Sequence, residues 1–229
     1  ETARARLEAA FVDAPGGTVD ILLSDHTDIP NGFARVSPSN RIAVFAQPPV
    51  DDPNLGYFDE WMELVVTHEL AHIYHLDRTG VLGRIARSVV GRYPATWPVF
   101  PNQAAPRWTI EGLATWYESR LSDAGREHGT FQEAILRAAI LEDRFESLDQ
   151  ASGDSPVWPG GTRSYTYGSE FFDYLLERHG EERMATFVDA VARQWIPYRL
   201  NAAGSDAFGE PVDDAWAAWS DSLRVRWAD

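Results

Sequence analysis

The sequence predicts an α+β protein with a small N-terminal β-sheet lobe and a mainly helical C-terminal lobe. Two short aliphatic runs, at 19–23 and 41–46, are separated by turn residues at 28–32 and are typical of strands. Beyond about residue 57, apolar residues recur at helical spacing. With 229 residues, 44% of them hydrophobic, the chain is long enough to bury one substantial core.

We therefore expect a single domain over 1–229. Its β-rich part covers about 1–56, the helices of a candidate site cover 57–121, and a helical lobe covers 122–229. The spacing of apolar residues and the positions of helix-ending and turn residues predict seven helices and one loop. The helices are at about 1–12, 58–77, 108–121, 128–143, 165–179, 181–195 and 211–227, and the loop is at 151–163.

The string His-Glu-Leu-Ala-His at 68–72 is the most informative feature of the predicted helix 58–77. His68 and His72 lie four residues apart, so both imidazoles share one helix face and can bind one divalent ion, with Glu69 beside them. A catalytic zinc site has three protein ligands and leaves a fourth position to water, from which Glu69 would take a proton. The alternative is a helix with two unrelated histidines, since the string arises by chance on the order of once in a hundred such sequences.

His75 shares the face of His68 and His72, but one straight helix cannot deliver all three imidazoles to one ion. Seven residues of helix separate His68 from His75 by about 10.5 Å, whereas each ligand nitrogen must lie about 2 Å from the metal. We therefore expect His75 to be structural or to bind a partner.

A second helical pattern follows Pro106 and reads Trp-Thr-Ile-Glu-Gly-Leu-Ala from residue 108. Here the chain resembles the gluzincins, zinc peptidases in which a glutamate on a later helix is the third ligand. The sequence around this glutamate is similar to that of zinc aminopeptidases such as aminopeptidase N. The resemblance implies His68, His72 and Glu111 as ligands of Zn²⁺ and Glu69 as general base. It also implies that Glu118 orients a ligand histidine, although an exposed helix glutamate is an equal alternative.

The segment from Tyr165 to Gly168 is similar to the Y-x-x-G segment of the same peptidases. In those enzymes the tyrosine hydroxyl donates a hydrogen bond to the oxyanion of the tetrahedral intermediate, a task suited to a neutral phenol. The matching residue is Tyr165, and Tyr167 is the rival candidate. The alternative is that both rings only pack against a neighbouring helix.

The longer stretches, over about 18–195, look like the peptidase MA-like family of bacterial gluzincins. This resemblance implies a thermolysin-like zincin fold, export to the periplasm or cell envelope, and, in a longer parent protein, a possible C-terminal TolB-like β-propeller. The chain departs from the aminopeptidases in having no G-x-M-E-N segment, which binds the free amine of their substrates. We therefore expect an endopeptidase whose peptide or protein substrate pairs with an edge strand at 41–46.

Composition excludes several classes of protein. The net charge of −15 argues against nucleic acid as a partner, because neutralising phosphates would need a basic face. All twenty Lys and Arg residues are arginine. No run of about 18 apolar residues predicts a transmembrane segment, and no leader pattern indicates a signal peptide in this chain. The absence of cysteine excludes disulfides and thiolate ligands.

Residues 78–110 contain five arginines and no acidic residue, and 81–92 mix apolar and basic residues as a short amphipathic helix does. This segment could be a lid, a dock for an acidic partner, a membrane-surface contact or a solvated connection. For the whole chain, the alternative to a zinc peptidase is a catalytically quiet zinc-binding or peptide-binding scaffold domain of a larger envelope protein. The presence of Glu69 favours catalysis, because a structural zinc site needs no base.

Overall fold

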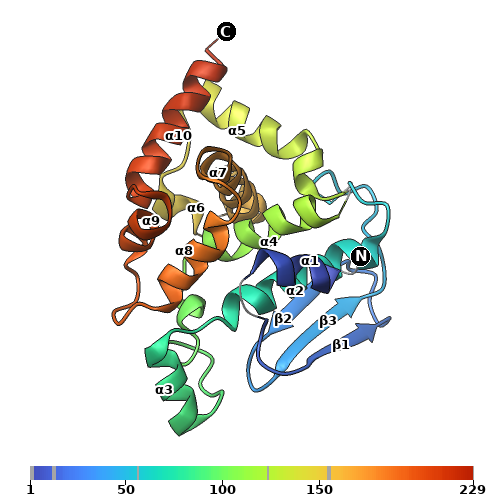
Figure 1. Ribbon diagram of the computed structural model, residues 1–229. Helices are drawn as coiled ribbons and strands as arrows, with labels where there is room; N and C mark the ends of the chain where they lie inside the picture. Colours follow the sequence, from blue (N-terminus) through green and yellow to red (C-terminus); the bar gives the residue numbers. More distant parts are fainter. Residues whose placement is uncertain (1–2, 12–13, 56, 123, 154–155, 229) are drawn as a thin grey trace.

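Three strands form a small mixed sheet in the computed structural model, and α-helices make up most of the remaining chain (Figure 1). The strands are β1 (Val19–Ser24), β2 (Gly32–Arg35) and β3 (Asn40–Phe45), in the order β1-β3-β2. β3 is parallel to β1 and antiparallel to β2. The structure describes residues 3–11, 14–55, 57–122, 124–153 and 156–228.

The two strands expected from the sequence are confirmed, but the assignment of 41–46 to the sheet edge is wrong. β3, which covers most of 41–46, is the central strand, and its Ile42 and Val44 side chains are buried. The edge beside the helices is β2, whose four residues begin inside the 28–32 turn signal. This strand begins at Gly32, directly after Asn31. It has too few residues to show the alternation of apolar and polar residues that is typical of strands.

Helix α2 (Trp61–Leu76) carries the 68–72 string and runs between the sheet and the helical part (Figure 1). Thirteen of its residues are buried, so it is enclosed on nearly every side, as expected for a helix that is apolar all round. It begins three residues later than the sequence predicts and ends just before Asp77.

Asp77 ties the end of α2 to three other parts of the chain. Its carboxylate accepts hydrogen bonds from the backbone N–H of Gly16 at 2.9 Å and from Nδ2 of Asn40 at 3.0 Å. It also forms ion pairs with Arg87 and Arg92, at 2.9 and 3.0 Å. A carboxylate at a helix C-terminus is unfavourable to the helix dipole, and the two guanidinium groups offset this repulsion.

Helices α4 (Arg107–Leu121) and α7 (Arg163–His179) pack against each other through two glycines. A Cβ on Gly112 would lie 2.3 Å from the carbonyl carbon of Gly168, and one on Gly168 would lie 2.7 Å from Cα of Gly112. Only glycine permits this approach of two backbones. It brings the turn of α4 that carries Glu111 next to the turn of α7 that carries Tyr165.

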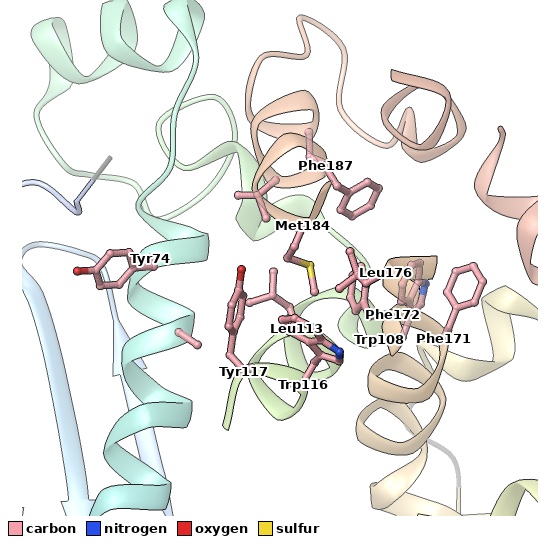
Figure 2. Packing of buried hydrophobic residues seen from close by; sticks show 14 of the residues in the cluster. Tyr74, Trp108, Leu113, Trp116, Tyr117, Phe171, Phe172, Leu176, Met184 and Phe187 are labelled. Carbon is pink, nitrogen blue, oxygen red and sulfur yellow. The ribbon is translucent and has the colours of Figure 1, made fainter. Parts of the chain in front are cut away.

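Aromatic and aliphatic side chains fill the space between α4, α7 and α8 (Arg183–Ala192) (Figure 2). Trp108 of α4 is fully buried and lies 5.5 Å, between ring centroids, from both Phe171 and Phe172 of α7. Met184 and Phe187 of α8 extend the same cluster. This packing fixes α4 and α7 as a rigid pair.

The other helices surround this pair or lie at the margins of the molecule (Figure 1). The remaining predicted helices are confirmed with boundaries shifted by a few residues, whereas α9 was not predicted because its Ala-, Gly- and Ser-rich sequence has no clear apolar period. Among the described residues, no helix is both long and apolar enough to cross a bilayer. The bounds are α1 (Ala3–Ala10), α3 (Val81–Val90), α5 (Phe131–Leu141), α6 (Leu148–Ala151), α9 (Leu200–Phe208) and α10 (Val212–Arg226), with 3₁₀ turns η1 (Pro101–Ala104), η2 (Arg126–His128) and η3 (Gly160–Thr162).

Candidate metal centre

A cleft of about 380 Å³ lies between β2, α2, α4 and the start of α7. It joins residues from six separate parts of the sequence, between Pro30 and Tyr165. All the site residues singled out from the sequence line it: His68, Glu69, His72, Glu111, Glu118 and Tyr165. His26, His128 and His179 do not line this cleft.

Two imidazoles and one carboxylate converge at the floor of the cleft. Nε2 of His68 lies 3.7 Å from Oε2 of Glu111, and Nε2 of His72 lies 3.4 Å from the same oxygen. Two ligand atoms bound tetrahedrally to zinc at its usual bond lengths stand about 3.4 Å apart. The ligand atoms of the three residues all lie within 4.8 Å of one another, so small side-chain shifts would close them on one ion.

The donor set also fits zinc chemically. Two neutral imidazoles with one carboxylate form a known class of catalytic zinc site, which leaves a fourth position open. Within the described part of the chain, this trio is the group of His, Asp and Glu side chains arranged to hold a metal ion. The residues present therefore fit a zinc ion.

The second nitrogen of His68 is fixed by a buried carboxylate. Nδ1 of His68 lies 2.7 Å from Oε2 of Glu118, a residue only 1% exposed. With Nδ1–H donated to this carboxylate, Nε2 faces Glu111 and the cleft and is the nitrogen that would bind a metal once its proton is displaced. The exposed-glutamate alternative for Glu118 is wrong, since it is buried against His68.

Arg126 of η2 holds Glu118 in its charged form. Its Nη1 lies 3.0 Å from Oε2 of Glu118 and donates to Oγ1 of Thr115 at 3.1 Å. Burial by itself would raise the pKa of Glu118, but the charge of Arg126 and the hydrogen bond from His68 lower it below its ordinary value. A carboxylate that is almost entirely buried therefore remains ionised beside His68.

The charges of the other site residues are coupled in the same way. Burial opposes protonation of His68, but its hydrogen bonds with Glu111 and Glu118 outweigh burial and raise its pKa to about 9. Burial would raise the pKa of Glu111, yet hydrogen bonds with His68 and His72 hold it well below its usual range. The cluster thus keeps both carboxylates negative, so Glu111 is available as an anionic ligand.

Glu69 lies on α2 against the first residue of β2. The side chain is 5% exposed, and a Cβ on Gly32 would stand 2.7 Å from its Oε1. Only a residue without a side chain leaves room for Glu69 at this contact. The glutamate therefore faces the cleft between the candidate metal ligands and the edge strand.

Tyr165 and its rival Tyr167 occupy different environments. Tyr165 lines the cleft, with its ring centroid 6.2 Å from that of His68 and the guanidinium of Arg126 4.8 Å from the ring centre. Burial and the nearby charge of Glu111 raise its pKa to about 12, so the phenol is protonated at neutral pH. Tyr167 is fully buried and packs on Trp216, so it does not reach the cleft.

His75 belongs to the core rather than to the metal cluster. It is fully buried, and burial, followed by the effect of His72, lowers its pKa to about 3. The imidazole is therefore neutral at physiological pH and acts as a structural side chain, one of the two roles expected from the helix geometry.

Comparisons of the chain with protein-family models, with curated proteins and with solved structures find no match. The family resemblance therefore depends on the motif residues themselves.

Sequence reasoning missed two features of the cleft. Arg126 stands eight residues after Glu118 on a short 3₁₀ turn, with no motif around it, and only the fold brings it back to that carboxylate. Arg107 was also missed, although its position one turn before Glu111 is a signal for an ion pair, here 3.8 Å long.

Proposed function

We propose that this chain is a zinc-dependent peptidase domain of the gluzincin type, with a zincin fold. The observation that carries the proposal is the convergence of Nε2 of His68, Nε2 of His72 and Oε2 of Glu111 on one point. The carboxylate of Glu118 behind His68 supports it further, because such a partner is usual for zinc-bound histidine. When bound, zinc polarises the substrate carbonyl and brings the pKa of water close to 7.

Glu69 acts as general base and then as general acid in this proposal. It faces the cleft beside the two histidines, where it can take a proton from the attacking water and pass it to the departing amine. Tyr165 donates its hydroxyl hydrogen to the oxyanion that forms on the carbonyl. Its high pKa, about 12, suits this role because the donor stays protonated.

The substrate is an extended peptide that pairs with β2. The cleft is lined by Gly32, Phe33 and Ala34, and β2 pairs with β3 along its other edge. Backbone N–H and C=O groups at a free strand edge bind extended chains without regard to side-chain sequence. Such a cleft has no requirement for a terminal amine, so we propose cleavage of internal bonds.

The test is a peptide-library digest with the wild-type chain, with a zinc chelator and with Glu69→Gln. Glu69→Gln should retain one zinc per chain and lose at least about a thousandfold in kcat, because the ligands survive and the proton acceptor is lost. Glu63→Gln is the matched control, since Glu63 is exposed in the first turn of the same helix. Peptides with acetylated N-termini should be cleaved at rates similar to those of peptides with free N-termini.

The outcomes separate the peptidase from its alternative. A wild-type chain that binds zinc but cleaves nothing in the library would favour the quiet scaffold. Full activity of Glu69→Gln would remove Glu69 from the mechanism. Stepwise loss of single residues from free-amine peptides alone would show an aminopeptidase instead of an endopeptidase.

A further inference from the structure

Helix α3 projects from the body of the molecule (Figure 1). Several of its apolar side chains are exposed. Val81, Ile85 and Val89 are each more than half exposed and are spaced by four residues, so they lie along one side of the helix. Val90, the last residue of α3, and Tyr93 beyond the helix are also more than half exposed. Within the part of the chain that the structure describes, this apolar side of α3 is therefore largely uncovered.

The loop between α8 and α9 adds a second exposed apolar group beside α3. Trp195, Ile196 and Tyr198 are all more than 60% exposed. The start of α3 is joined to the end of α8, because the N–H of Gly80 donates to the carbonyl of Ala192 at 3.0 Å. The 193–199 loop therefore begins beside the start of α3, where Arg193 lines one hollow with Val81 and Arg84. Residues 81–93 and 193–199 are together named the α3 face.

The charge of the α3 face is opposite to that of the chain as a whole. Residues 81–93 and 193–199 contain five arginines and no acidic residue, whereas the net charge of the chain is −15. Two of the five, Arg87 and Arg92, pair with Asp77 at the base of α3. Arg84, Arg193 and Arg199 are exposed on this face. Screening at physiological salt limits charge interactions to about 8 Å, so a ligand at the α3 face meets the arginines and little of the distant acidic surface.

A cavity of about 360 Å³ lies at the base of α3 and is also rich in arginine. Four guanidinium groups stand around it against two carboxylates. The excess positive charge suits a phosphate group at the edge of the apolar side of α3. The residues concerned are Arg78, Arg84, Arg87 and Arg193, with Asp77 and Asp189.

We propose that the α3 face binds the surface of an anionic lipid bilayer. Aliphatic side chains at the level of the acyl boundary, Trp and Tyr at the interface and arginine near the head groups are the arrangement that peripheral membrane helices use. The face is formed by a projecting helix and an exposed loop, which suits insertion into a soft surface. This inference concerns a surface outside the metal cleft and is independent of the proposed peptidase activity.

The experiment is co-sedimentation of the full chain with vesicles of phosphatidylcholine alone and of phosphatidylcholine with phosphatidylglycerol. The chain should bind the anionic vesicles, dissociate from them as the salt concentration increases, and show no binding to the neutral vesicles. Arg84→Glu should weaken binding about thirtyfold, since it removes one favourable charge and adds an unfavourable one. Val89→Ser should weaken it about tenfold.

Matched controls come from exposed residues elsewhere on the chain. Val225 is 80% exposed, as against 78% for Val89, and the side chain of Arg144 is 70% exposed. Val225→Ser and Arg144→Glu should leave vesicle binding unchanged. Equal losses in these controls, or no binding of the wild type to anionic vesicles, would overturn the proposal. It would also be overturned if the chain formed dimers that Val89→Ser dissociates, because the face would then be covered by a second copy.

Discussion

The two sides of helix α2 are built differently. On one side, α4 and α7 pack through Gly112 and Gly168 with their backbones in contact, around a fully buried Trp108. On the other side is a sheet of three short strands. In its edge strand β1, every residue is exposed or only partly buried. The helical side is rigid and closed, whereas the sheet side is thin and ends in a free edge.

This difference matches a division of tasks at the cleft. The helical side supplies Glu111, Glu118 and Tyr165, groups that must keep fixed positions relative to His68. The sheet side supplies backbone groups of β2, which can pair with any extended chain. Under the proposed function, groups on a rigid pair of helices would keep their geometry when substrates of different sequence occupy the edge strand.

The largest effect is expected from crowding the helical side. Gly112→Val would place side-chain carbon within about 2.3 Å of the Gly168 backbone, and neither helix can yield without separating from the other. The free energy of unfolding should fall by about 3 kcal/mol, and zinc affinity should fall with it. Chemical denaturation measures the first quantity. Gly161→Val is the control, since a Cβ there meets no atom within 4 Å.

An intermediate effect is expected where the helical side orients a ligand. Glu118→Gln leaves a side chain that can still accept from Nδ1 of His68, but it removes the charge that Arg126 now neutralises. Zinc affinity should decrease tenfold to a hundredfold, as measured by competition with a chromophoric chelator. Glu63→Gln, on the exposed part of α2, should have no effect; an unchanged affinity in Glu118→Gln would show that this carboxylate does not support the metal.

The smallest effect is expected on the sheet side, and it should spare the metal. Gly32→Ala places a methyl group 2.7 Å from Oε1 of Glu69 and from Cγ2 of Val65, so Glu69 or β2 must shift. The value of kcat/KM should fall about tenfold while zinc affinity stays the same. Gly161→Ala should change neither. If zinc affinity fell in Gly32→Ala, both sides of α2 would support the metal and the division of tasks would be wrong.

The sequence predicted best what depends on a single helix. His68 and His72 share one face because of the helical period alone, so their proximity follows from spacing. Glu111 and Tyr165 could be named through a family resemblance, but their approach depends on the contact between Gly112 and Gly168, which no local pattern reveals.

What could not be predicted depends on long-range contacts or on very short elements. Arg126 reaches Glu118 only because η2 folds back onto α4. β2 has four residues, too few for an alternating pattern, so the edge was assigned to the longer strand that is in fact central. The amphipathic character of 81–92 was visible in the sequence, yet its exposure beside the 193–199 loop required the structure.

The central claim is that His68, His72 and Glu111 bind one zinc ion, and metal titration of the chelator-treated chain tests it most directly. The wild type should bind one zinc per chain, and so should His26→Ala, whose histidine is exposed and outside the cleft. His72→Ala and Glu111→Ala should each lose tight binding, because two ligands hold zinc poorly. A wild-type chain that binds no zinc, or Glu111→Ala with wild-type affinity, would contradict the account.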